Sequence, residues 1–132
     1  MTTLTVRTRE REQLLDITDE VEGAIREAGV AEGVCFIWSL HTTCGVTVNE
    51  SADPDVGRDI AARLAALAPR DADYRHAEGN ADAHIKTSLV GTCATLPVAD
   101  GKLLLGTWQG VFLAEFDGPR SRRVAVRVLP AR

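Results

Sequence analysis

The sequence lacks any apolar run near the roughly 20 residues that a membrane-spanning helix requires, so we expect no membrane partner. Its first residues, MTTLTVRTRERE, also lack the apolar centre of a secretion signal. Cysteine is scarce. Cys35, Cys44 and Cys93 are odd in number and have no CxxC spacing, which argues against a disulfide framework and a thiolate zinc finger. Together these absences predict a cytoplasmic protein.

Positive charge is not in excess either. Fifteen Lys and Arg residues against nineteen Asp and Glu residues give a net charge of -4, which predicts no nucleic-acid partner. Apolar residues make up 45% and charged residues 26%, as is typical of a folded globular protein. A chain of 132 residues is long enough for one hydrophobic core and short for two, so we expect a single domain over residues 1–132.

Apolar and polar side chains alternate along several short segments, the pattern of half-buried strands. This pattern predicts strands at residues 3–8 and 13–17, and further strands in VCFIWSL, GVTVN, ATLPV, KLLLGTW, GVFLAEF and RVAVRVL. Residues 83–90 are predicted as a short helix before Gly91, after a polar loop over residues 70–82. Strands therefore outnumber helices, without regular βαβ alternation.

Two longer helices have recognisable ends. Thr18 is predicted to cap the first helix, which ends at Gly29. Asp53 is predicted to cap the second, which has Pro54 at its first position and ends before Pro69.

All three histidines of the chain lie in two polar stretches near its middle. His41 opens HTTCGVTVNESADPD, and His76 and His84 lie in YRHAEGNADAHIKTS. Neutral imidazole binds metals or transfers protons near neutral pH, so we hypothesise that the three histidines share a metal or phosphate site. The alternative is that each histidine is an ordinary surface or hydrogen-bonded residue.

Further polar side chains accompany the histidines. Asn49 and Glu50 end a strand and supply oxygen donors of the kind that Mg²⁺ prefers. On a helix, Ser88 lies four residues after His84 on the same face, whereas Lys86 points elsewhere. Asp53 and Asp55 are explained by capping of the second helix, which leaves them outside the predicted site.

The segment GTWQGVFLAEFDGPRSR carries a third group of candidates. Trp108 places an aromatic face beside the amide of Gln109, and the GPR turn presents Arg120, which can hold a phosphate. The alternative for Trp108 is packing in the core or in an interface. Arg122 and Arg123 are predicted as a solvated basic edge.

Three long motifs, HTTCGVTVNESADPDV, YRHAEGNADAHIKTSLVG and GKLLLGTWQGVFLAEFDGPRSRRVAV, resemble the YjbQ family in order and spacing. The resemblance spans most of the chain, although the N-terminal part matches only in general pattern. Cys44 and Cys93 stand where other small residues are usual. The resemblance implies a single α+β domain with a largely antiparallel, sandwich-like sheet and two main helices. It also implies a homotrimer with sites near the subunit boundaries.

The resemblance further implies the activity of a secondary thiamine-phosphate synthase. Such an enzyme joins a hydroxymethylpyrimidine diphosphate to a thiazole phosphate and releases pyrophosphate, so a phosphorylated small molecule is the expected partner. A divalent metal, Zn²⁺ or Mg²⁺, is expected at His41, His76 and His84. The candidate catalytic residues are Asn49, Glu50, Gln109 and Glu115, and the candidate substrate-binding residues are Lys86, Ser88, Trp108 and Arg120.

Two other functions stay open at this point. Imidazole suits Zn²⁺ better than Mg²⁺, so the histidines could hold Zn²⁺ in a hydrolase of a small molecule, with Glu50 or Glu115 as general base. Alternatively, a trimer could bind a metal or a phosphorylated metabolite without turning it over.

Overall fold

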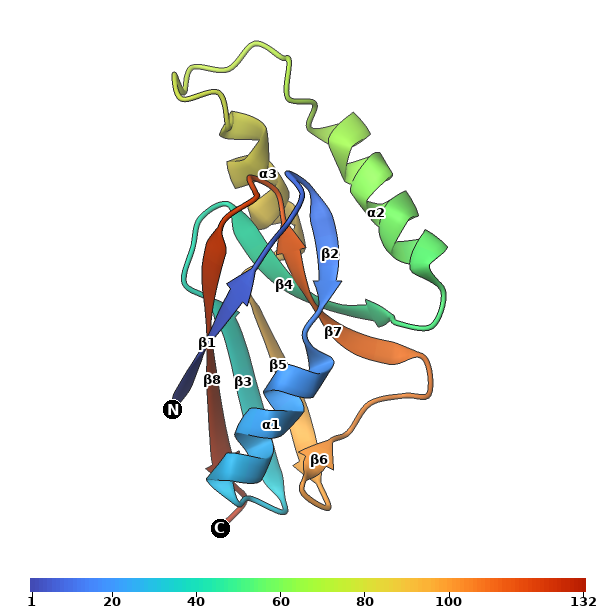
Figure 1. Cartoon of the computed structure of the whole chain (residues 1–132), viewed down its shortest axis with the longest axis vertical. Coiled ribbons are helices and arrows are strands. Elements are labelled where there is room, and N and C mark those ends of the chain that lie inside the picture. The colour runs from blue at the N-terminus through green and yellow to red at the C-terminus, as the bar shows by residue number, and fades with distance from the viewer.

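Two antiparallel sheets make up most of the computed structural model, which describes residues 1–132 (Figure 1). The larger sheet has five strands in the order β1-β8-β3-β5-β6, and the smaller has three in the order β2-β7-β4. The strands are β1 Thr2–Arg7, β2 Gln13–Asp16, β3 Gly33–Ser39, β4 Cys44–Glu50, β5 Cys93–Ala99, β6 Lys102–Leu103, β7 Gln109–Glu115 and β8 Ser121–Pro130. The helices are α1 Thr18–Ala28, α2 Pro54–Leu67 and α3 Ala81–Val90.

The predicted α+β fold with largely antiparallel sheets is confirmed. Alternation decides which side chains fill the core, because every second residue of a strand points to the same face. Cys35 and Ile37 of β3 point inward and are fully buried, and Val111 of β7 meets them from the smaller sheet. Val21 and Ile25 of α1 are also fully buried, so this helix closes the core beside the larger sheet.

The first helix begins differently from the prediction. Its N-cap is Ile17 rather than Thr18, and no side chain caps it. The Thr18 hydroxyl instead donates to Asp16 at 2.5 Å and accepts the backbone N–H of Val111 at 2.9 Å. Thr18 thus ties the helix start to β7, because this tertiary partner competes with the local cap.

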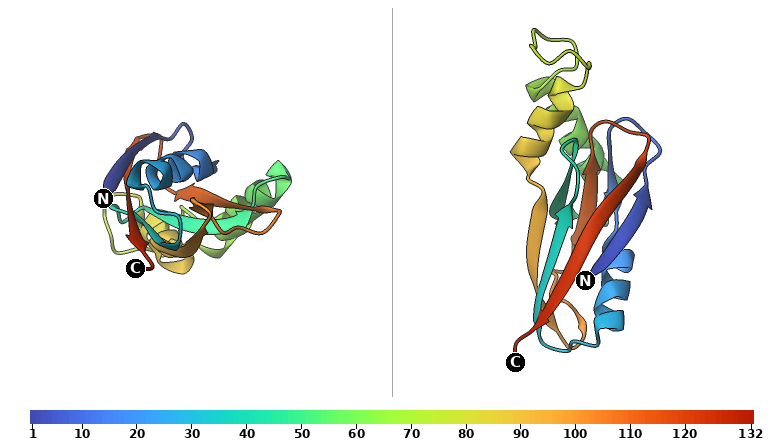
Figure 2. Two further views of the ribbon diagram at one scale, coloured as in Figure 1. Left: turned by 90° about the horizontal axis from the view of Figure 1, so that it is seen from below. Right: turned by 90° about the vertical axis from the view of Figure 1, so that its left-hand side faces the viewer.

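The other helices differ in how firmly they are held. Asp53 caps α2 as predicted, accepting the backbone N–H of Asp55 at 2.9 Å. No residue of α2 is buried, however, and Figure 2 shows the helix standing to one side of both sheets. The third helix is longer than predicted, starting at Ala81, and it buries four residues.

The strand predicted in KLLLGTW is the main overestimate. Only β6, Lys102–Leu103, pairs with β5, and the chain then turns, with Gln109 donating its backbone N–H to the carbonyl of Gly106 at 3.1 Å. The apolar residues of this segment do not alternate strictly with polar ones, so no single face of a strand is specified. The turn at Gly106 therefore ends the strand early. No helix is both long and apolar enough to span a membrane.

A buried ion pair joins the two sheets at the ends of β7 and β8. Glu115 is 0% exposed and Arg122 is 1% exposed. Arg122 donates through Nε to Glu115 Oε1 at 2.8 Å and through Nη2 to Oε2, and Nη2 also reaches the Thr43 hydroxyl at 2.8 Å. The Glu115 carboxylate further accepts the Thr8 hydroxyl and the backbone N–H groups of Phe116 and Asp117. Both carboxylate oxygens of Glu115, and Nε and Nη2 of Arg122, therefore have hydrogen-bond partners, as burial requires.

These partners decide the charge state of Glu115. Burial raises the pKa of the carboxyl, but the hydrogen bonds from Arg122, Asp117 and Thr8 outweigh burial and hold the pKa below its ordinary value of 4.5. Glu115 is therefore ionised at neutral pH, with its lone pairs already committed.

Glu115→Gln should destabilise the fold strongly, because the substitution keeps the side-chain shape but leaves the Arg122 guanidinium buried without a carboxylate. We expect the free energy of unfolding in urea to fall by about 3–5 kcal/mol. The control is Asp55→Asn, which removes the 72% exposed partner of Arg58 and should cost about 0–1 kcal/mol. Equal losses in the two variants would contradict the role of the buried pair.

Candidate functional site

An open pocket of about 350 Å³ lies where the loop between β3 and β4, the start of α3 and the turn between β7 and β8 meet. This volume is within the range of small-molecule sites. Its lining is mostly polar and consists of Leu40, His41, Thr42, Thr43, Glu78, Asn80, His84, Asp117, Arg120 and Arg122. A larger hollow of about 770 Å³ lies along α2, but only residues of that helix line it, so it brings no separate elements together.

His41 has a defined hydrogen-bonding state. Its Nε2 accepts the backbone N–H of Arg123 at 2.8 Å, so Nδ1 carries the ring proton of the neutral imidazole. Burial lowers the pKa of His41, and the nearby charges of Arg122, Arg120 and Arg123 lower it further, against an opposing contribution from Glu115. At neutral pH His41 is therefore an uncharged donor, surrounded by three arginines.

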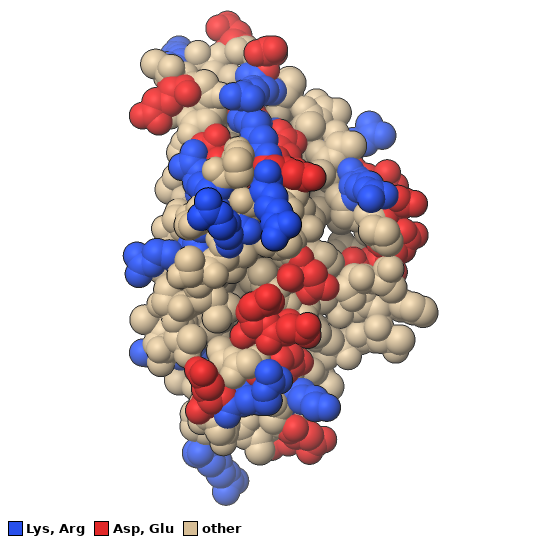
Figure 3. Space-filling view, in the orientation of Figure 1, with Lys and Arg blue, Asp and Glu red and all other residues tan.

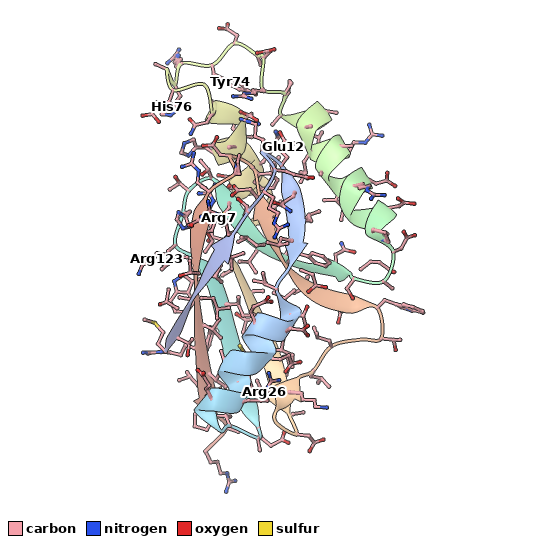
Figure 4. The ribbon with its side chains drawn as sticks, in the orientation of Figure 1. Arg7, Glu12, Arg26, Tyr74, His76 and Arg123 are labelled. Atoms are coloured by element: carbon pink, nitrogen blue, oxygen red, sulfur yellow. The ribbon has the colours of Figure 1, made fainter.

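The second wall of the pocket comes from α3 and the loop before it. The rings of His76 and His84 pack edge to face, with centroids 5.2 Å apart and an angle of 80° between their planes. His84 lines the pocket, whereas His76 does not and approaches Glu78 at 3.6 Å. Figure 4 shows His76 in the loop that leads into α3. Asn80 donates from Nδ2 to Asp117 at 2.8 Å, which links this wall to the β7–β8 turn.

The third wall is the predicted GPR turn, which presents Arg120. Its Nε donates to the Asp117 carbonyl at 2.8 Å, and its Nη2 donates to the Asp117 carboxylate at 3.2 Å. A guanidinium has five N–H donors, so others remain available to a ligand on this half-exposed side chain. Figure 3 shows most of the Lys and Arg side chains of the drawn face in its upper half, with Asp and Glu side chains among them.

The structure separates the predicted site residues into groups. His41, His84 and Arg120 share the pocket, and Glu115 lies behind it, covered by Arg122. Lys86 is fully buried on the opposite side of α3, where its ammonium is 2.8 Å from both Asp82 and Glu12. Ser88 is exposed on α3 and does not line the pocket.

Four predicted residues lie at the far end of the smaller sheet. Glu50 pairs with Gln109 there, six residues along β4 from the pairing of Cys44 with Glu115, which is about 20 Å at the rise of a strand. Gln109 accepts the backbone N–H of Gly106, and Glu50 accepts that of Asp53, so both shape local turns. Asn49 and Trp108 are the other two predicted residues at this end of the sheet, and the Trp108 side chain is 62% exposed.

The arrangement does not fit a three-histidine zinc site. No group of three or more His, Cys, Asp and Glu side chains is placed to hold a metal ion. Nε2 of His41 already accepts the Arg123 backbone N–H. The remaining ring nitrogen, Nδ1, carries the proton and so has no lone pair for a metal ion. A tetrahedral zinc site needs deprotonated ring nitrogens that converge, and these rings do not supply them.

Sequence reasoning missed several pocket residues. Arg122 was predicted in a solvated edge, and this prediction is wrong because the side chain is 1% exposed. The signal was the strand period: Arg122 shares its parity with Val124 and Val126, which face the core, whereas Arg123 faces outward. Thr43, Asn80 and Asp117 carried no comparable signal, because tertiary contacts bring them together.

Comparisons with known proteins place this chain among a group of similar sequences. Residues 2–131 match the family model described as UPF0047 protein YjbQ-like. UPF0047 protein MJ1081 of Methanocaldococcus jannaschii is 51% identical, covering 94% of this chain and 90% of the relative. UPF0047 protein YugU of Bacillus subtilis is 44% identical over 96% of this chain and 97% of its own length.

A solved structure agrees with these sequences. The crystal structure of a YjbQ/UPF0047 family protein from Clostridium acetobutylicum has a TM-score of 0.96 and 46% identity, covering 98% of this chain and 100% of that one. The names of these three proteins state a family and no reaction, so the chemistry has to be argued from the pocket.

The state of His41 predicts a pH dependence of stability. Because its folded pKa lies below the ordinary value of 6.5, the unfolded chain binds more protons, and this contribution to stability is lost as pH falls through 6.5 toward the folded pKa. NMR titration of the three imidazoles should show His41 titrating below 6.5. Urea midpoints between pH 7.5 and 5.5 should fall less in His41→Gln, which keeps an acceptor without a titrating ring. A His41 midpoint at or above 6.5 would exclude this assignment.

Proposed function

The chain belongs to the YjbQ-like UPF0047 family, and we propose that it is a cytoplasmic enzyme whose pocket binds a phosphorylated small molecule for a transfer of the thiamine-phosphate synthase kind. In this reaction a thiazole nitrogen attacks the methylene carbon of a hydroxymethylpyrimidine diphosphate. The new C–N bond forms, the C–O bond to the diphosphate breaks, and pyrophosphate leaves.

The arginine N–H donors around His41 are the observation that carries the proposal. Three arginines lie close enough to His41 to lower its pKa, and one of them, Arg120, is half-exposed in the pocket. Arginine suits phosphate because its planar N–H groups match the spacing of phosphate oxygens. Arg120 and Arg122 line the pocket together with the carboxylates of Glu78 and Asp117, so the anion would be held by directed N–H donors rather than by an excess of positive charge.

Each residue has a role that follows from its geometry. Arg120 has free N–H groups to hold the diphosphate, and Arg122 adds a guanidinium whose position is fixed by its pairing with Glu115. His41 donates from Nδ1 while staying neutral. Donors that are fixed before the reaction stabilise a leaving group best while negative charge accumulates on it.

Mg²⁺ fits this chemistry better than Zn²⁺, because it prefers oxygen ligands and commonly enters with the phosphates of a substrate. Glu78 and Asp117 are the carboxylates that line the pocket, and they are the residues that could contact such an ion. When bound, Mg²⁺ would neutralise part of the diphosphate charge. The zinc hydrolase and the non-catalytic binding protein are the alternatives.

The test is pyrophosphate release from the two thiamine precursors in the presence of Mg²⁺, together with binding of pyrophosphate measured by calorimetry. Arg120→Ala should weaken pyrophosphate binding roughly 10- to 100-fold, the value of a charge-assisted hydrogen bond. The control is Arg58→Ala, which removes the same charge from an exposed pair on α2.

The outcomes separate the three functions. Product formation that needs Mg²⁺ and falls in Arg120→Ala supports the transferase. Binding of pyrophosphate without product supports a non-catalytic binding protein. Stoichiometric zinc in protein purified without chelators, with no pyrophosphate binding, would favour the hydrolase and overturn the proposal.

We also propose that the protein acts as a homotrimer, which the resemblance implies. An apolar groove of about 540 Å³ on the outer face of the larger sheet supports an apolar contact between copies. It exposes Phe36 (37%), Leu129 (47%) and Leu104 (59%), and apolar side chains that gather on one surface are typical of a contact between proteins. Such an assembly can also bring Glu50 and Gln109 of one copy near the pocket of another, although they lie far from it within one chain.

Sedimentation equilibrium should give a mass three times the 14.2 kDa of the chain. Phe36→Asp should lower this mass to that of the monomer while the circular dichroism spectrum is kept, because it places a charge in the apolar groove. The control, Ile85→Asp, changes a similarly exposed (41%) apolar side chain on α3 and should remain trimeric. A monomeric wild-type protein would refute the assembly.

A further inference from the structure

The loop between β1 and β2, residues 8–12, connects two walls of the pocket from behind. Thr8 donates its backbone N–H to the Arg120 carbonyl at 2.9 Å, and its hydroxyl accepts the Arg120 backbone N–H at 3.0 Å. Arg11 accepts the backbone N–H of Gly118 at its carbonyl oxygen at 3.0 Å. The loop is thus bonded along the whole turn that presents Arg120.

Close approach of the two backbones explains the glycine in that turn. A Cβ added to Gly118 would lie 2.3 Å from the carbonyl oxygen of Glu10, which no side chain could relieve because the blocking atom is backbone. Arg9 and Glu10 donate their N–H groups to the Gln13 side chain, so the loop also holds its own shape. The loop is therefore a fixed support rather than a free connection.

The same loop holds α3 through Arg11. The Arg11 guanidinium donates with both terminal nitrogens to the two carboxylate oxygens of Asp82, each at 3.1 Å. Asp82 is fully buried in the first turn of α3, and Lys86 donates to it at 2.8 Å. Glu12 of the loop completes the cluster by accepting from Lys86 and Arg11 (Figure 4 labels Glu12).

Asp82 lies between two pocket residues, His84 of α3 and Asn80, the N-cap residue at the start of α3. His84 is two positions after Asp82 on the helix, so its side chain faces away from the Asp82 carboxylate. A planar fork that grips a carboxylate at both oxygens fixes rotation as well as distance. Fixing Asp82 therefore sets how far α3 is turned toward the pocket.

We propose that Arg11 is a positioning residue, whose grip on Asp82 holds α3 so that His84 and Asn80 face Arg120 across the pocket. Arg11 itself is not part of the pocket lining. The inference rests on the proposed function for the ligand that the pocket takes, but the orientation of α3 can be measured without any ligand.

The experiment compares Arg11→Met with Arg9→Met in the full-length protein. Both variants remove one positive charge from the same loop, but the Arg9 side chain is exposed and makes no hydrogen bond or ion pair. Arg11→Lys is the third variant, since it keeps the charge and loses the two-pronged geometry. It also keeps the test informative if Arg11→Met does not fold.

The first measurement needs no ligand. In Arg11→Met the imidazole NMR signals of His76 and His84 should shift, since α3 turns and changes their edge-to-face packing, while the His41 signal on another wall should stay in place. Amide exchange of His84 should quicken about tenfold, as local opening of the first turn becomes easier. The Gly118 amide should keep its protection, because it bonds to the backbone of residue 11.

The second measurement is pyrophosphate binding by calorimetry. If only a tenth of the molecules keep α3 in place, the apparent affinity falls about tenfold. Arg11→Lys should lie between the wild type and Arg11→Met, and Arg9→Met should match the wild type in both measurements.

Unchanged His76 and His84 signals in folded Arg11→Met would overturn the positioning role, and so would an equal effect of Arg9→Met. Absence of pyrophosphate binding in the wild type would overturn the proposed function instead. In that case the histidine signals still decide whether Arg11 orients α3.

Discussion

The buried pair of Glu115 and Arg122 is the constraint on which the rest of this molecule depends. Glu115 ends β7 in the smaller sheet and Arg122 lies near the start of β8 in the larger one, so their contact joins the sheets where the chain passes between them. Glu115 also accepts a hydrogen bond from Thr8 in the loop after β1, and Arg122 donates one to Thr43 in the loop before β4. Three segments distant in sequence are therefore held at one point beneath the pocket.

A buried ion pair is a costly way to join two sheets, because both charges lose their hydration. Well-packed apolar residues in the same place often give equal or greater stability. The cost is reduced here because both carboxylate oxygens and two of the three guanidinium nitrogens have hydrogen-bond partners, including two backbone N–H groups on the carboxylate. What an apolar pair could not supply is charge at the pocket. Arg122 lines the pocket and lowers the pKa of His41, while Glu115 opposes that shift and fixes the guanidinium in place, so the pair serves the site as well as the fold.

Much of the fold could be predicted from the sequence because the periodicity of a strand is local. The alternating segments of β1, β3 and β8 lie where they were expected, and α2 begins at the predicted cap. The path of the segment after β6 could not be predicted. Its apolar residues favour a strand, but a turn at Gly106 ends the strand after Leu103. Thr18 shows the same limit, since a tertiary partner took the hydroxyl that a local rule assigned to capping.

The site was harder to predict because antiparallel pairing separates residues that chemistry would group. Glu50 and Glu115 were both candidate bases, yet the register places them at opposite ends of the smaller sheet. Lys86 was misleading for another reason. Lysine is rarely buried, so a charged residue on a helix suggests an exposed face, whereas here Asp82 and Glu12 accept hydrogen bonds from its ammonium inside the protein.

Charge burial and pocket chemistry are connected by how each side chain is held. Glu115 and Lys86 were candidates for direct roles, but the oxygens of Glu115 already accept hydrogen bonds within the protein, and Lys86 is fully buried with its ammonium on Asp82 and Glu12, away from the pocket. They act instead by holding neighbours that have free donors. Arg120 lies beside the hydrogen-bond network of Glu115, and His84 lies on the helix that Lys86 helps to fix in place. Donors held this way need no rearrangement when negative charge develops nearby, which is the property that anion-stabilising sites require. The same reasoning makes His41 more useful neutral than charged, since a neutral donor keeps its bond to Arg123 and still offers one N–H.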